Sequence, residues 1–117
     1  MGYESKLYVV EKSTIIDNNK RWGQVIAMID MCKLGNDFFL KLQNYSPTDC
    51  YIYLGDEEVT EDKYGDPLIE IPIKDMIAIL AEMASKENYR RLTPAINLLL
   101  GFNLSEWNEL VVLHYGY

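Results

Sequence analysis

Apolar and turn-forming residues at the start of the chain predict a pair of strands. Residues 6–13 are rich in β-branched and aromatic side chains, which favour extended structure. The turn formers of residues 17–19 follow, and then a nearly continuous apolar run covers 25–32. We predict two antiparallel strands. The second has little polar alternation, which is typical of a strand that is central or covered on both faces.

The middle of the chain predicts a short helix and then a strand. The apolar residues within 38–42 are spaced as on one helix face, with Asn36 or Asp37 as the candidate cap. Ser46-Pro47 should end this helix, because the residue before proline is biased away from helical angles. Residues 49–54 then read as a strand that stops at a glycine turn.

A further strand and an amphipathic helix follow an acidic segment. Residues 68–71 predict the strand, and Pro72 fits the first turn of the helix, where its missing N–H costs nothing. The apolar positions recur at helical spacing, so we expect them to face the core, with Ile77 and Leu80 among the buried residues. The stripe consists of Ile73, Met76, Ile77, Leu80 and Met83.

The last third of the chain predicts another helix and a final strand. Thr93 is the candidate cap, Pro94 the first helical residue and Gly101 the position just past the end. Leucines at 98–100 suggest burial on most sides of this helix. Ser105 resembles a further cap, and residues 110–115 read as a strand that pairs with the N-terminal one.

These elements predict one domain over residues 1–117, of the α+β class. We expect an antiparallel sheet of four or five strands packed against two or three helices. Composition agrees, because 49% of the residues are hydrophobic and 25% are charged, values close to the globular average.

The charge balance changes the expected partners. Eighteen acidic residues against eleven basic ones give a formal net charge of −7, which disfavours direct contact with nucleic acid or with an anionic membrane. The clustered cations are Lys86, Arg90 and Arg91, and we interpret them as complementing the end of a helix. The chain shows no signal-peptide pattern or apolar span of membrane length, so we expect it in the cytoplasm.

No metal or cofactor is expected. Cys32 and Cys50 lie too far apart for a zinc motif and are too few for a disulfide framework, so we predict two reduced core thiols. An EF-hand loop read from Asp56 fails, because its sixth residue is Glu61 rather than glycine. Read from Asp62, the sixth residue is Pro67.

The acidic segment 54–66 is the predicted contact surface. We expect an exposed connection bent at Gly55 and Gly65, with its carboxylates pointing into water. Nine tyrosines and two tryptophans accompany the excess of acids. This combination suits contact with a basic protein surface, and spaced carboxylates can imitate a phosphate backbone. The predicted partner-binding residues are Asp56, Glu57, Glu58, Glu61, Asp62, Tyr64 and Asp66.

An alternative function is a small enzyme or ligand-binding domain with a pocket near Asp30 and His114. Asp30 is embedded in apolar sequence, where burial would perturb its pKa, although a hydrogen-bonded structural role is also compatible. His114 is the single histidine of the chain, and a packed histidine in a strand is the competing interpretation.

Three segments resemble a known family: the opening MGYESKLYVVEKS, the centre TDCYIYLGDEEVTEDKYGDPLIEIPI and the closing WNELVVLHYGY. They are similar to small acidic proteins encoded by bacterial phages and prophages. The resemblance implies a bacterial host cell, and proteins of this kind often inhibit host defence enzymes, anti-CRISPR proteins among them. It assigns no residue a role. We expect a non-enzymatic accessory protein that binds and inhibits a host protein with a basic, nucleic-acid-binding surface.

Overall fold

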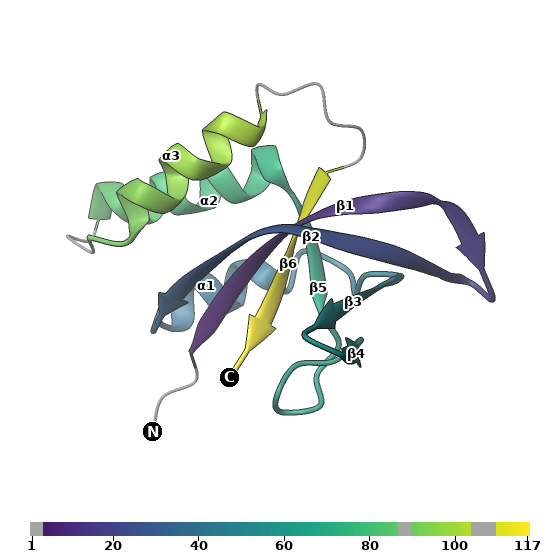
Figure 1. Cartoon of the computed structure of the whole chain (residues 1–117). Helices are drawn as coiled ribbons and strands as arrows, with labels where there is room; N and C mark the ends of the chain where they lie inside the picture. Colours follow the sequence, from purple (N-terminus) through teal and green to yellow (C-terminus); the bar gives the residue numbers. More distant parts are fainter. Residues whose placement is uncertain (1–3, 87–89, 104–109) are drawn as a thin grey trace.

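The chain forms a curled sheet with three helices on one side (Figure 1). The computed structural model describes residues 4–86, 90–103 and 110–117. The strand order is β4-β3-β2-β1-β6-β5. In chain order the elements are β1 (Ser5–Asp17), β2 (Lys20–Cys32), α1 (Asn36–Leu42), β3 (Cys50–Leu54), β4 (Glu57–Val59), β5 (Ile69–Pro72), α2 (Ile73–Lys86), α3 (Leu92–Asn103) and β6 (Leu110–Gly116).

The predicted α+β class is confirmed, with six strands in place of four or five. The additional strand is β4, which lies inside the acidic segment and pairs with β3. β4 has three residues, and two of them are glutamates. Such a short acidic strand shows no alternation of apolar and polar residues in the sequence.

The first two strands form the predicted antiparallel hairpin, and they are longer than expected. Asn18 and Asn19 have φ angles of 50° and 62°, so both occupy the left-handed region that a two-residue primed turn requires. Asparagine tolerates this region better than most residues. The strands therefore continue up to the turn, and β1 also pairs antiparallel with β6 as predicted.

The sheet is mixed rather than wholly antiparallel. β3 runs parallel to β2, with Arg21 opposite Cys50 and Trp22 opposite Tyr51. A parallel pair needs a crossover connection, and α1 with its flanking loops supplies it. The prediction of a purely antiparallel sheet is wrong at this pair.

The segment before β3 connects the two edges of the sheet. Pro47 forms a bridge with Ile69, and the N–H of Thr48 donates to the carbonyl of Leu68 over 2.8 Å. This segment therefore pairs with β5, the strand at the far edge. The curl encloses an apolar cluster on the face away from the helices. The buried members of that cluster are Tyr8, Val10, Cys50, Ile52, Val59, Leu68 and Leu113.

The larger core lies between the sheet and the helices, and α2 supplies much of it. Leu80 is fully buried, as predicted. Ile77 is only partly buried, and Ile79 lies in the core as well. Pro72 is the last residue of β5 rather than the first of the helix, and its ring still ends the strand immediately before α2.

The other helices differ from prediction at their ends. Gly35, with φ of 83°, precedes α1, and no side chain caps that helix, so the predicted caps at Asn36 or Asp37 are wrong. α3 begins at Leu92 and continues through Gly101. Its apolar face is narrower than expected, because Leu99 is buried whereas Leu98 and Leu100 are each 40% exposed. The predicted cap at Ser105 lies outside the described residues.

Among the described helices, none has the length and apolar character needed to cross a membrane.

Candidate functional site

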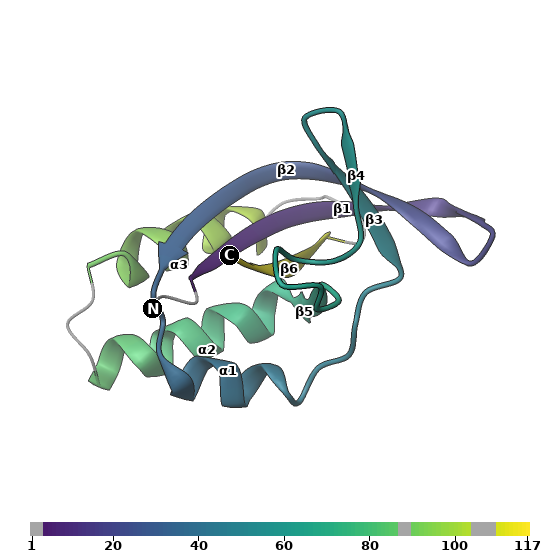
Figure 2. The same cartoon turned by 90° about the horizontal axis from the view of Figure 1, so that it is seen from below.

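The first part of the acidic segment, residues 54–59, completes a hairpin of β3 and β4 that stands out from the sheet (Figure 2). Gly55 has a φ of 67°, which permits the tight turn between β3 and β4. Val59 pairs with Ile52 and is buried, so it fixes the hairpin on the apolar cluster inside the curl. We call residues 50–66 the acidic hairpin. Its carboxylates at Asp56, Glu57, Glu58, Glu61 and Asp66 are exposed.

Asp62 is the exception, because it is buried rather than exposed to water. Its Oδ1 atom accepts hydrogen bonds from the backbone N–H groups of Tyr64 at 2.8 Å and Asp66 at 3.1 Å. Gly65, with φ of 84°, completes this turn. The prediction that Asp62 points into water is wrong, and this carboxylate shapes the loop that carries its exposed neighbours.

A polar hollow lies beside the acidic hairpin. Its volume is about 410 Å³, and Glu57, Glu58 and Glu61 line it together with Lys63 and Tyr115. Two more tyrosines are exposed on this part of the chain, Tyr53 at 48% and Tyr64 at 53%. The region therefore offers clustered negative charge and amphipathic aromatic area, the two features expected of a surface that binds protein.

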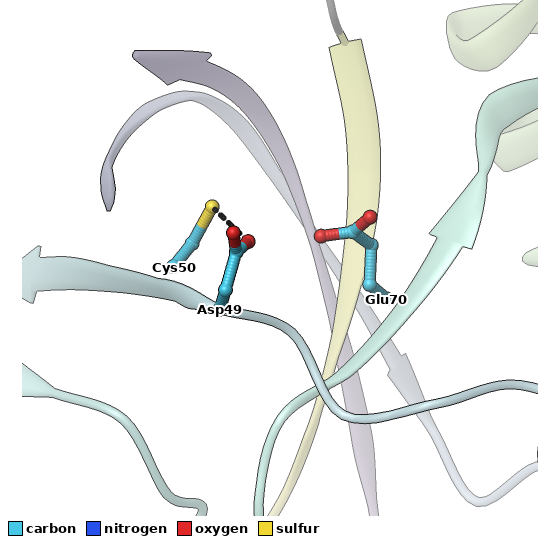
Figure 3. A group of neighbouring side chains, drawn as sticks. All are labelled: Asp49, Cys50 and Glu70. Carbon is cyan, nitrogen blue, oxygen red and sulfur yellow. Dashed lines mark hydrogen bonds between the residues drawn. The ribbon is translucent and has the colours of Figure 1, made fainter. Parts of the chain in front are cut away.

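A second polar cluster joins Asp49, Cys50 and Glu70, whose potential ligand atoms all lie within 4.8 Å of one another (Figure 3). Lys12 lies close to both carboxylates. Its Nζ atom is 3.3 Å from Oδ1 of Asp49 and 3.1 Å from Oε1 of Glu70. Arg21 adds a second cation, with Nε at 3.1 Å from Oδ2 of Asp49.

The charges in this cluster balance one another. Burial alone would raise the pKa of Asp49, but the bonds and charges of Lys12 and Arg21 outweigh it and lower that pKa. Burial also raises the pKa of the Cys50 thiol, so it stays protonated near neutrality. A divalent metal prefers a thiolate and would have to compete with the ammonium of Lys12. We interpret the group as an ion-pair cluster that ties β1 to β5 and to the residue before β3.

Replacing Lys12 tests this interpretation. Lys12→Met should lower the free energy of unfolding by about 1 to 3 kcal/mol, because it leaves the partly buried carboxylate of Glu70 without its cation. Lys74→Met on the exposed side of α2 is the control, with an expected change within about 0.5 kcal/mol. Urea titration measures both. A thermal midpoint of the unaltered protein that rises with added Zn²⁺ would instead identify the cluster as a metal site.

Sequence reasoning missed this cluster because its residues come from four separate segments: β1, β2, the start of β3 and β5. Asp49 and Cys50 are adjacent in the chain, but Glu70 reaches them only because the segment before β3 pairs with β5. The spacing of these residues matches no ligand motif. No local signal could therefore have revealed the cluster.

His114 is buried in β6 and packs against aromatic rings. Its Nε2 atom lies 2.8 Å from Oγ of Ser5, and the Phe38 and Phe39 rings lie 5.6 Å and 5.7 Å from its own. Burial lowers its pKa to about 4, although the charge of Asp62 acts in the opposite direction. The imidazole is therefore neutral at physiological pH.

Asp30 is a hydrogen-bonded carboxylate near the end of β2. The Tyr117 hydroxyl donates to its Oδ1 over 2.6 Å, and the Cys32 N–H donates to the same atom over 3.0 Å. The Tyr117 bond is the largest influence on the Asp30 pKa, and it lowers that pKa. This geometry fits the structural interpretation of the residue rather than a raised, catalytic carboxyl.

Asp30 and His114 lie on opposite faces of the sheet. Asp30 is opposite Lys6 in the β1–β2 pair, whereas His114 is opposite Leu7 in the β1–β6 pair. Adjacent residues of one strand point to opposite faces. The two side chains therefore do not line one shared pocket.

In comparisons with known proteins, no family model, no curated protein and no solved structure matches this chain. A function can therefore be argued only from the chemistry of the described residues. Asp30 and His114 each bond to a neighbouring side chain, and the Lys12 cluster is internally neutralised. The acidic hairpin differs, because most of its charge faces solvent.

Proposed function

We propose that this chain is a phage or prophage accessory protein that binds a bacterial host protein through the acidic hairpin and inhibits it. The partner carries a basic surface that normally handles nucleic acid. The observation that supports the proposal is the exposure of Asp56, Glu57, Glu58 and Glu61 on a hairpin whose base is fixed in an apolar cluster.

The anchoring of the acidic hairpin in the apolar cluster matters, because less conformational entropy is then lost when its charged side chains bind a partner. Side chains held on a rigid element lose less entropy on binding than the same side chains on a disordered tail. The turn made by Asp62 holds the second half of the segment in the same way. A basic groove that recognises phosphates would attract these exposed carboxylates.

The net charge of the chain adds long-range attraction to the local contacts. A formal charge of −7 raises the rate of encounter with a basic protein, and salt screens this effect. Exposed Tyr53 and Tyr64 supply apolar area at the same end of the molecule. The host context and the inhibitory outcome rest on the resemblance to small acidic phage proteins.

The proposal is tested by removing two negative charges either from the acidic hairpin or from another part of the surface. The first variant carries Glu57→Gln and Glu58→Gln in the acidic hairpin. The matched control carries Asp17→Asn and Asp37→Asn, at exposed positions outside the acidic hairpin. Both lose two negative charges, so any difference between them reflects position. The partner is captured from a bacterial lysate on the unaltered protein, and association rates are then measured for all three proteins.

The hairpin variant should bind at least roughly threefold more slowly than the control at low salt, with the rates converging at high salt. Both variants should keep the thermal midpoint of the unaltered protein, because exposed charges contribute roughly 0 to 1 kcal/mol to stability. Equal association rates at low salt would remove the hairpin from the interface. Tight stoichiometric Ca²⁺ binding by the unaltered protein would assign the carboxylates to an ion instead.

A further inference from the structure

One edge of β2 lacks a neighbouring strand over much of its length. β3 pairs with β2 only at Arg21 and Trp22, so within the described part of the chain residues 24, 25 and 27–30 have a strand partner on the β1 side alone. Figure 2 shows β2 continuing past β3 toward α3. A strand edge of this kind presents backbone N–H and C=O groups that another extended chain can pair with.

An apolar groove runs beside this edge, between β2 and α3. Its volume is about 580 Å³, which is within the range of pockets that bind small ligands and peptide side chains. Ile29 on the strand lines the groove and is opposite Leu7 in the β1–β2 pair, so its side chain faces the helices. Leu98 on the helix is 40% exposed. Pro94 and Ala95 complete the helical wall of the groove.

One hydrogen bond shows which backbone groups face the groove. Nη1 of Arg91, which lies just before α3, donates to the backbone carbonyl of Asp30 over 2.7 Å. That carbonyl therefore points away from β1 and toward the helix. Successive residues of a strand direct their backbone groups to alternate sides, so the N–H and C=O of Met28 point the same way.

The groove is basic in an otherwise acidic protein. Arg90 and Arg91 both line it and are exposed, whereas the whole chain carries a net charge of −7. A guanidinium has five N–H donors, so the bond of Arg91 to Asp30 leaves further donors for a carboxylate.

We propose that this groove binds an extended peptide segment of a partner protein, which adds as a strand to the β2 edge. Apolar side chains of the peptide contact Ile29 and Leu98, and an Asp or Glu of the peptide lies beside Arg90 and Arg91. This mode combines backbone hydrogen bonds with side-chain pockets. It does not rest on the proposed function, because β3 of the acidic hairpin pairs with β2 only at Arg21 and Trp22, toward the opposite end of that strand from Asp30 (Figure 1).

A second copy of the chain fits the same edge less well. Two copies paired antiparallel about Met28 would place Ile26 of one copy opposite Asp30 of the other, which gives Arg91 no carboxylate. Each copy would also bring a net charge of −7 to the contact. A heterologous peptide avoids both problems.

Peptide selection tests the proposal directly. Peptides are selected from a random displayed library against the full chain, and the enriched ones are synthesised. We expect sequences with alternating apolar residues and at least one Asp or Glu. Their binding should slow amide hydrogen exchange at Met28 and Asp30, measured by NMR, because new inter-strand hydrogen bonds protect these groups.

Three substitutions locate the binding site. Arg91→Glu and Leu98→Glu should each weaken peptide binding about tenfold or more, measured by fluorescence polarisation. Leu100→Glu is the matched control for Leu98→Glu, because both leucines are 40% exposed on α3 and Leu100 does not line the groove. Met28→Pro should also weaken binding, because proline removes an N–H from the open edge. Circular dichroism confirms that each variant folds.

Several results would overturn the proposal. They are a failure to enrich any peptide, equal binding by Leu98→Glu and Leu100→Glu, and amide protection confined to residues away from β2. Concentration-dependent dimerisation that protects Met28 and Asp30 without peptide would assign the edge to a second copy of the chain.

Discussion

Leu80→Ala is expected to lower the free energy of unfolding by about 2 to 5 kcal/mol. Leu80 is fully buried on α2 and belongs to the cluster between the helices and the sheet. Truncation removes its apolar contacts and leaves a cavity that the surrounding residues fill only in part. A loss of this size is a large share of the stability of a small domain. Urea titration at constant pH measures it.

Leu40→Ala is the matched control, because the same change is made on α1 at a leucine that is 60% exposed. Its expected cost is about 1 kcal/mol or less. Ile77→Ala should fall between the two, since Ile77 only packs partly against the core. Equal thermal midpoints for Leu80→Ala and Leu40→Ala would contradict the placement of α2 on the sheet.

Elements with a strong local signal could be predicted from the sequence. The β1–β2 hairpin follows from β-branched runs on either side of Asn18 and Asn19, and its turn is set by those two residues alone. The helical spacing of α2 predicted a buried face that includes Leu80. In both cases neighbouring residues in the chain decide the structure.

Features that depend on distant segments could not be predicted. The parallel pairing of β3 with β2 covers two residue pairs, and it arises from the path of the chain through α1. The contact of Lys12 with Asp49 and Glu70 needs the sheet to curl first. The open edge of β2 is also invisible in the sequence, because it depends on where β3 stops pairing.

The candidate acidic site could be predicted in part. The sequence predicted that the carboxylates of this segment are exposed, and most of them are. The prediction for Asp62 is wrong, yet the sequence carries a signal for its structural role: an aspartate followed by Gly65 is typical of a turn in which the carboxylate accepts backbone N–H groups. A count of acidic residues does not distinguish an exposed carboxylate from one that forms a turn, as Asp62 does.

Stability should depend on pH through His114. Burial places its folded-state pKa at about 4, below the ordinary value of 6.5. Below pH 6.5 the unfolded chain takes up a proton that the folded protein does not, so stability is fully present above pH 6.5 and is lost as the pH falls toward 4. The expected loss between pH 7 and pH 4.5 is about 2 to 3 kcal/mol, since one pKa unit corresponds to about 1.4 kcal/mol.

His114→Gln separates this effect from the titration of carboxylates. Glutamine does not ionise, and its amide can still bond to Oγ of Ser5. Asp30 and Asp49 have lowered pKa values, so their stabilisation is lost mainly below the ordinary aspartate value of 3.8. Urea titrations of both proteins from pH 7 to pH 4.5 should therefore show a steep decline for the unaltered protein and a shallow one for the variant. Parallel declines, or an NMR titration of the His114 ring with a pKa near 6.5, would show that the imidazole is not held neutral by burial.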